Sequence, residues 1–214
     1  MVFFEAGAQD RRLSAPRPWN SCSPRGLGGY DEPMTHPFAG ARFDELIRMP
    51  RASLEGIMRH GTTPTADHLD GWEFRGYNPP IFARVLGFQK FIKGFFRDSQ
   101  GLAGYNLFVQ APRGGPDRPW IAKGGGDPRA RHGYYDVVAV QPGGRYSDFP
   151  DAVLLDYGSG RNSALNPESR IRDFLVQVDP DNPDLYLGKA FLDLGIARMF
   201  SNFFVLERLQ RAPT

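Results

Sequence analysis

The chain has 214 residues, of which 41% are hydrophobic and 13% aromatic, and this excludes a chain that is disordered throughout. Its 26 basic and 24 acidic residues are mixed along the sequence and leave a net charge of only +2. No block of like charges therefore points to nucleic acid or to an anionic membrane as a partner. With one cysteine, Cys22, the chain has neither an internal disulfide nor a thiolate metal cluster.

The longest apolar runs, such as FFVL at 203–206, fall far below the roughly 20 residues of a membrane-spanning helix. The sequence starts with MVFFEAGAQDRR, which lacks the basic start, apolar centre and cleavage site of a secretory signal. We therefore expect a cytoplasmic protein without an integral membrane segment. The glycine-rich segment KGGGD at 123–127 lacks the Gly-Lys-Ser/Thr ending of a phosphate-binding loop, and we expect no cofactor.

Composition divides the chain into three parts. Residues 1–40 are rich in Pro, Gly, Arg and Ser without a helical or strand period, which predicts a flexible arm. Residues 41–64 are a helical lead-in of two pieces, the second starting at Pro50 and ending at Gly61. Residues 65–210 form the third part, which begins with a short turn that leads into its first strand.

In this third part the hydrophobic period changes to two, with turn residues between the apolar runs. Eight or nine strands with short connections, and no alternation of strands with helices, predict a mostly β fold, an antiparallel β-barrel. The segment PPIFARVLG is expected to insert one short helix between the first two strands. The strand-like segments are WEFRGY, KFIKGFF, YNLFVQ, WIAK, YYDVVAV, AVLLDY, IRDFLVQV, LYLGKAFLDL and MFSNFFVLERL.

Trp72, at the start of the first strand, is expected to plug one end of the barrel. Gly71 before it allows a sharp turn without a Cβ clash. Arg208, near the end of the last strand, is placed to reach across the seam and lay its guanidinium on the indole. The alternative interpretation of this pair is purely structural: the two side chains close the barrel and contact no ligand.

Gly-Trp on the first strand with Arg on the last resembles the calycin superfamily, the lipocalins and their relatives, although Gly71 and Trp72 are adjacent here and not spaced Gly-x-Trp. The chain is also similar to families of unassigned function with a Gly-x-Trp-x-Gly block. The resemblance implies a calycin-like barrel that binds something apolar, and it supplies no catalytic residue. The parallel segments are LDGWEFRG at 69–76, KGFF at 93–96, RDFLVQVD at 172–179, LYLGKA at 185–190 and FFVLER at 203–208.

Several polar residues fall on strand faces that are otherwise apolar, where they must pair with one another or meet the head group of a ligand. Lys93 or Lys189 with Asp173 could orient a carboxylate or a carbonyl at the end of an apolar pocket. The alternative is that Asp173 lies outside, in a surface ion pair. The expected interior and ligand-binding set is Tyr77, Lys93, Tyr105, Tyr135, Asp173 and Lys189.

Metal binding and nucleophilic catalysis find little support. His60 and His68 do not have the i, i+4 spacing of ligands on one helix face. No Gly-x-Ser-x-Gly elbow occurs, and Cys22 lies in the expected arm. His132, before a strand with Tyr135 and Asp136, could abstract a proton from an apolar substrate, although loop histidines are usually only solvated.

The sequence therefore favours a binding protein over an enzyme. We expect it to bind a small hydrophobic or amphipathic molecule, similar to a fatty acid or an isoprenoid, inside the barrel. Two alternatives remain open. One is an enzyme that uses the same cavity for acid–base chemistry on an apolar substrate. The other is a barrel filled by its 17 phenylalanines, which serves as a structural or interaction module.

Overall fold

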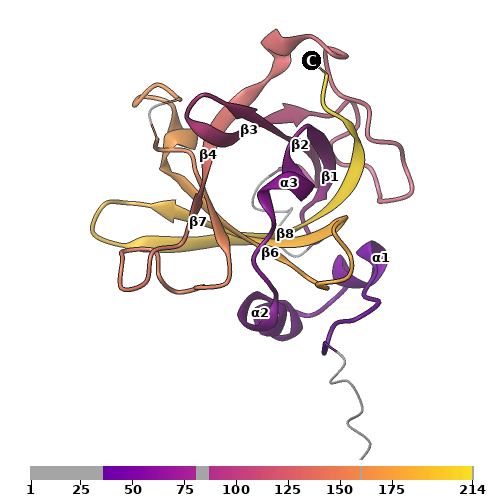
Figure 1. The fold of residues 1–214 in the computed structure, drawn as a ribbon. Helices are drawn as coiled ribbons and strands as arrows, with labels where there is room; N and C mark the ends of the chain where they lie inside the picture. Colours follow the sequence, from indigo (N-terminus) through magenta and orange to yellow (C-terminus); the bar gives the residue numbers. More distant parts are fainter. Residues whose placement is uncertain (1–35, 81–86, 160, 214) are drawn as a thin grey trace, which may run out of the picture. The chain divides into compact units, whose positions relative to one another are not determined.

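The computed structural model describes residues 36–80, 87–159 and 161–213 (Figure 1). Most of the expected arm and the centre of PPIFARVLG lie outside these residues. Two short 3₁₀ turns, Pro128–Ala130 and Pro167–Arg170, lie in the connections. The helices and strands are α1 (Phe43–Leu46), α2 (Arg51–His60), α3 (Ala66–Leu69), β1 (Trp72–Tyr77), β2 (Lys90–Asp98), β3 (Gly101–Phe108), β4 (His132–Ala139), β5 (Val153–Asp156), β6 (Ile171–Gln177), β7 (Leu185–Asp193) and β8 (Arg198–Arg211).

The eight strands form a closed antiparallel barrel, which confirms the predicted fold class. Each strand pairs with the next, and β8 returns to pair with β1, with Trp72 opposite Arg211 and Tyr77 opposite Val205. The segment WIAK does not add a ninth strand. Its backbone makes only an isolated bridge between Ala122 and Val109, and the Trp120 indole donates to the carbonyl of Gly76 at 3.1 Å.

The wall of the barrel is buried on both sides over much of its area. Successive side chains of a strand point to opposite faces, so each strand supplies one row to the interior and one to the outside. In β2 the interior row is Phe91, Lys93 and Phe95, as the alternation predicts. The interior cluster consists of Leu69, Phe74, Phe91, Phe95, Tyr135, Val153, Leu155, Tyr157, Leu175, Tyr186, Ala190, Phe204 and Leu206.

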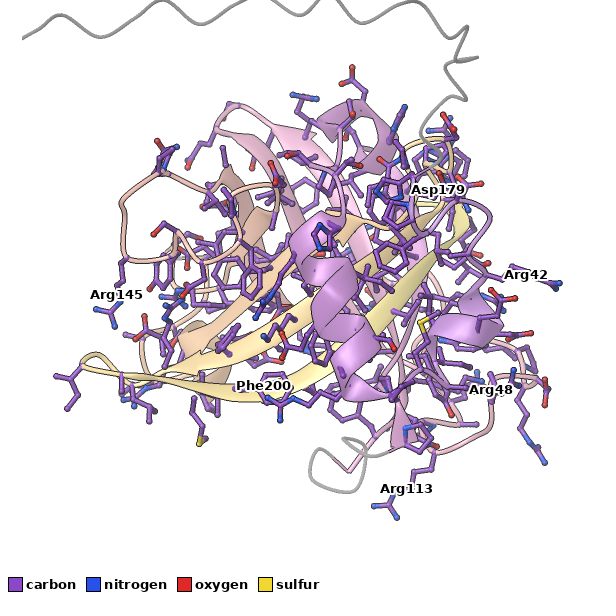
Figure 2. All side chains as sticks on the ribbon, turned by 90° about the horizontal axis from the view of Figure 1, so that it is seen from below. Arg42, Arg48, Arg113, Arg145, Asp179 and Phe200 are labelled. Carbon is purple, nitrogen blue, oxygen red and sulfur yellow. The ribbon has the colours of Figure 1, made fainter. Side chains whose placement is uncertain are left out.

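Helices α1 and α2 cover part of the outer face of the barrel. In Figure 2, α2 lies across β7 and β8, with Phe200 beside it. Leu54, Ile57 and Met58 share the buried face of α2, as the helical period predicts. The helix starts after Pro50 and ends before Gly61, both as expected. A second hydrophobic core therefore lies between these helices and the outer face of the barrel.

The α3 end of the barrel is closed by Leu69, which is fully buried, and by Trp72, which is half-buried. Gly71 has φ +73°, in the left-handed region where a glycine is favoured, so the chain can turn directly into β1. The guanidinium carbon of Arg208 lies 4.4 Å from the centroid of a Trp72 ring, and that of Arg211 lies 3.9 Å away on the same indole. The contact expected between Trp72 and Arg208 is therefore present, and a second arginine joins it.

Aromatic rings lie directly over three glycines on the inner face of the barrel wall. A Cβ on Gly188 would lie 2.0 Å from the Phe204 ring, and one on Gly104 would lie 2.3 Å from the Tyr135 ring. Gly76 and Phe91 make the same arrangement at 2.3 Å. An eight-stranded barrel has an interior just wide enough for side chains or one small ligand. The absent Cβ atoms provide the space that these large rings occupy.

Replacing Gly188 with alanine should therefore destabilise the protein by about 1–3 kcal/mol, because the added methyl forces the Phe204 ring out of place. Urea unfolding of the variant measures this. Adding Phe204→Leu to Gly188→Ala should recover part of the loss. The steric explanation fails if the second substitution only lowers stability further. Gly115→Ala is the matched control, since a Cβ there meets no atom within 4 Å.

Candidate functional site

Four polar side chains meet inside the barrel, and we call them the interior polar cluster: Lys93, Asn106, Tyr157 and Asp173. Lys93 of β2 is opposite Asn106 of β3 in the strand register. Tyr157 directly follows β5, and Asp173 is the third residue of β6. Four segments of the wall thus each contribute one polar group to the same place.

The centre of the cluster is a buried ion pair. Lys93 Nζ lies 3.1 Å from Asp173 Oδ2, and the two residues are only 2% and 3% exposed. Four aromatic rings surround the ammonium, at 4.6 Å from Nζ to the centroid for Tyr135, 5.0 Å for Tyr157, 5.3 Å for Phe204 and 5.9 Å for Phe91. A charge pair in apolar surroundings is costly to desolvate, which makes this pair the candidate functional site of the interior.

The hydrogen bonds of the cluster use nearly every donor and acceptor. Lys93 Nζ donates to Asn106 Oδ1 at 3.1 Å, to the Tyr157 hydroxyl, and to Asp173 Oδ2. The Tyr157 hydroxyl donates to Asp173 Oδ2 at 3.2 Å and accepts from Asn106 Nδ2 at 3.1 Å. Asn106 Nδ2 also donates to the carbonyl of Gly133 at 3.2 Å.

One oxygen of the cluster is left over. Within the described part of the chain, Asp173 Oδ1 is buried and has no hydrogen-bond partner. A carboxylate oxygen that is removed from water without a donor costs free energy, so native proteins nearly always supply a partner from protein, water or ligand. The interior therefore contains one buried acceptor, Asp173 Oδ1, that has no donor among the described residues.

Burial shifts the ionisation of the cluster toward neutral forms. Desolvation raises the pKa of Asp173, and the charge of Lys93 opposes this rise. Desolvation likewise lowers the pKa of Lys93, against the attraction of Asp173. The pKa values of Tyr135 and Tyr157 lie well above that of a free tyrosine, first because of burial and then because of the nearby Asp173 carboxylate. Both phenols are therefore protonated hydrogen-bond donors.

A second polar pair lies next to the cluster. His132 Nδ1 is 2.8 Å from Glu168 Oε1, and the imidazole stacks on Phe108 with centroids 4.0 Å apart. The hydrogen bond from His132 is the largest cause that lowers the pKa of Glu168. A carboxylate accepts, so Nδ1 carries the proton, and Nε2 is buried without a partner among the described residues.

The His132–Glu168 pair predicts an acid-sensitive step in stability. Because the folded protein holds the pKa of Glu168 below its unfolded value, the stabilisation is present above the unfolded pKa and is lost as the pH falls through the folded pKa. Chemical denaturation from about pH 6 to about pH 3 should show this loss in the native protein. In Glu168→Gln the decline should be smaller, and an equal decline in both proteins would contradict the assignment.

The polar cluster lies toward the end of the barrel that α3 does not close. β2 and β6 begin at this end and β3 finishes there, because neighbouring strands are antiparallel. Side chains with interior register are partly exposed here, including Phe108 at 50% and, to a smaller degree, Ile171. Interior-register side chains are therefore more exposed at this end than at the end that Leu69 and Trp72 close.

The structure divides the six polar residues expected in the interior into two groups. Lys93, Tyr135 and Asp173 point inward, and the Tyr135 hydroxyl donates to the carbonyl of Gly94 at 3.1 Å. Tyr77, Tyr105 and Lys189 instead point outward. They are buried because helices, loops and neighbouring side chains cover the outer face.

The contacts of the outward group show what covers each residue. The ring of Tyr77 contacts Phe43 of α1, with centroids 6.4 Å apart. The Tyr105 hydroxyl donates to Glu73 Oε1 at 2.9 Å. Lys189 Nζ lies 2.6 Å from Glu55 Oε2 on α2. These three residues therefore belong to the packing outside the barrel and do not join the interior polar cluster.

Sequence reasoning missed two members of the cluster, Asn106 and Tyr157. The expected interior residue of β3 was Tyr105, the larger and more apolar neighbour of Asn106. The expected strand AVLLDY ends with Tyr157, which continues the alternation of Val153 and Leu155. Applying that alternation to the last residue of the segment would have found Tyr157.

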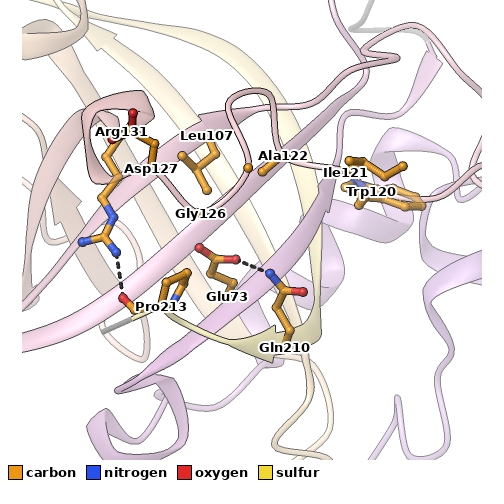
Figure 3. A pocket seen from close by; sticks show the side chains of 11 residues that line it. Glu73, Leu107, Trp120, Ile121, Ala122, Gly126, Asp127, Arg131, Gln210 and Pro213 are labelled. Carbon is orange, nitrogen blue, oxygen red and sulfur yellow. Dashed lines mark hydrogen bonds between the residues drawn. The ribbon is translucent and has the colours of Figure 1, made fainter.

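A surface pocket of about 290 Å³ lies on the outer face of the barrel (Figure 3). Its polar groups are already engaged. Glu73 accepts from Tyr105 and, at 2.8 Å, from Gln210, and Arg131 donates to the carbonyl of Pro213 at 2.8 Å. A ligand there would have to displace these hydrogen bonds, so the pocket is a weaker candidate than the interior polar cluster.

Among the described residues, no group of three or more His, Cys, Asp or Glu side chains is arranged to hold a metal ion. In the same part of the chain, no helix has the length and apolar character needed to cross a bilayer. Comparison with protein-family models, with curated proteins and with solved structures found no significant match. The closed eight-stranded barrel is compatible with a calycin-like fold.

Proposed function

We propose that this protein binds a small hydrophobic or amphipathic molecule inside the barrel, with the polar end of that molecule at the Lys93–Asp173 pair. The observation that carries the proposal is the buried Asp173 Oδ1, which has no partner among the described residues although aromatic side chains fill much of the surrounding interior. Binding sites for small molecules combine a mostly apolar lining with a few well-placed polar groups.

The binding energy would come mainly from burial of apolar surface, at roughly 25 cal/mol per Å² removed from water. Phe91 and Phe204 line the interior beside Lys93, and the half-exposed Phe108 marks the more exposed end. In the same proposal the barrel is a member of the calycin superfamily. The stacking of Arg208 on Trp72 at the closed end supports this membership.

Native mass spectrometry of protein purified from its own cells tests the proposal directly. We expect a bound molecule that dissociates on collisional activation, and the released mass identifies its class. A fluorescent alkyl-chain analogue should compete with that molecule. A bare mass for the protein, together with no binding of the analogue, would contradict ligand binding.

The close packing of the interior favours one other function, that of a solid-cored structural or interaction module. The rings of Phe91, Tyr135 and Phe204 occupy the space over three interior glycines. In such a protein the unpaired oxygen of Asp173 would be served by a buried water. Bare protein in the mass spectrum and unchanged unfolding in the presence of the analogue are the results that this alternative expects.

A further inference from the structure

We infer that the ligand of the barrel presents a neutral hydroxyl to Asp173 Oδ1, and is thus an alcohol with an otherwise apolar body. This inference rests on the proposed function and narrows the ligand class. A lysine inside a barrel suggests at first that an acidic head group binds to it, as the sequence analysis expected of Lys93. The hydrogen bonds of the interior polar cluster point the other way.

Lys93 has no donor left for a carboxylate or a carbonyl. An ammonium carries three N–H groups, and three acceptors surround Nζ: Asn106 Oδ1, the Tyr157 hydroxyl and Asp173 Oδ2. With Lys93 as an ammonium, these three contacts use all of its N–H groups.

Asn106 and Tyr157 likewise have no hydrogen-bond donor left for a ligand. Both protons of Asn106 Nδ2 have acceptors, in the Tyr157 hydroxyl and the carbonyl of Gly133. The single proton of Tyr157 is donated to Asp173 Oδ2. The group that remains is an acceptor, Asp173 Oδ1, and a complementary ligand must therefore bring the donor.

Charge decides between a hydroxyl and the charged head groups. Lys93 and Asp173 compensate each other, so the pair is neutral as a unit. A carboxylate at Oδ1 would face a second carboxylate in a buried site. An alkylammonium would donate, but it would add a second buried cation beside Lys93 among aromatic rings, where an uncompensated charge is costly. A hydroxyl donates and adds no charge.

A head-group series with one chain length tests this inference on the native protein. Isothermal titration with 1-octanol, octanoate and octylammonium at neutral pH should give the tightest binding for 1-octanol, by at least about tenfold, or about 1.4 kcal/mol, over either charged compound. Octanoate that binds as tightly as 1-octanol would overturn the hydroxyl assignment and leave ligand binding intact.

A double variant tests whether the hydroxyl of the ligand binds at the interior polar cluster. Lys93→Met with Asp173→Leu removes the acceptor together with its cation, and such apolar replacement of a buried pair usually preserves the fold. We expect the affinity for 1-octanol to fall several-fold in this variant. The control, Arg97→Gln with Asp67→Asn, removes the surface pair at 3.0 Å and should bind as the native protein does.

The outcomes separate the two proposals. Unchanged affinity for 1-octanol in the folded double variant would show binding away from Asp173 and overturn the hydroxyl assignment. If no member of the series binds to the native protein, both the hydroxyl assignment and the proposed function fail.

Discussion

Replacing Lys93 with methionine will lower the free energy of unfolding by about 3–5 kcal/mol, because it leaves the carboxylate of Asp173 buried without its cation. The lysine is 2% exposed, so water cannot replace the three hydrogen bonds that its ammonium donates. Equilibrium unfolding in urea measures the loss. Circular dichroism at the start of the titration should show that the variant still contains the β structure of the barrel.

The double variant Lys93→Met with Asp173→Leu is the decisive comparison. Desolvation raises the pKa of Asp173 and lowers that of Lys93, so the folded protein tolerates both charges at a cost. Removing both should therefore restore stability to near the native value or above it. A double variant that is as unstable as the single one would contradict this explanation. Lys123→Met changes an exposed lysine in the same way and should have little effect.

Replacing Phe74 with alanine should have an effect of similar size, also about 3–5 kcal/mol, for a different reason. Phe74 is fully buried inside the barrel, where its ring packs edge-on against Phe95 at 5.5 Å and Tyr186 at 5.4 Å between centroids. Alanine would remove these contacts and leave a cavity that the rigid wall cannot collapse to fill. Thermal and urea unfolding should both report the change.

Phe108→Ala is the matched control for Phe74→Ala. Phe108 also lies on a barrel strand, but half of its surface is exposed and its main ring contact is His132. We expect a loss of about 1 kcal/mol or less. If the two alanine variants lost equal amounts, the aromatic interior would not be the main hydrophobic core of the barrel.

The period-two pattern was sufficient to predict the strands of the barrel, because successive side chains of a strand point to opposite faces. In β2 the pattern places Phe91, Lys93 and Phe95 on one face and Lys90 and Ile92 on the other, in agreement with the strand register. The ninth expected strand, WIAK, failed for a reason that no local pattern contains. Trp120 is held instead by a hydrogen bond to Gly76 and by packing against Tyr77.

The candidate site was harder to predict than the fold, since alternation identifies two faces without saying which one is inside. Polarity usually decides, but here the outer face is also buried. Tyr105 and Lys189 therefore look like interior residues and lie outside, where Glu73 and Glu55 satisfy them. Lys93 and Asp173 were found because their strands carry aromatic and aliphatic neighbours on the same face.

The seam between β1 and β8 has a consequence for synthesis of the protein. Arg75 of β1 pairs with Glu207 of β8, and Gly71 accepts a hydrogen bond at 2.9 Å from the amide of Ala212. β1 also pairs with β2, but its second partner, β8, is made last among the strands. Until β8 has left the ribosome, β1 keeps an open edge that can pair with other chains.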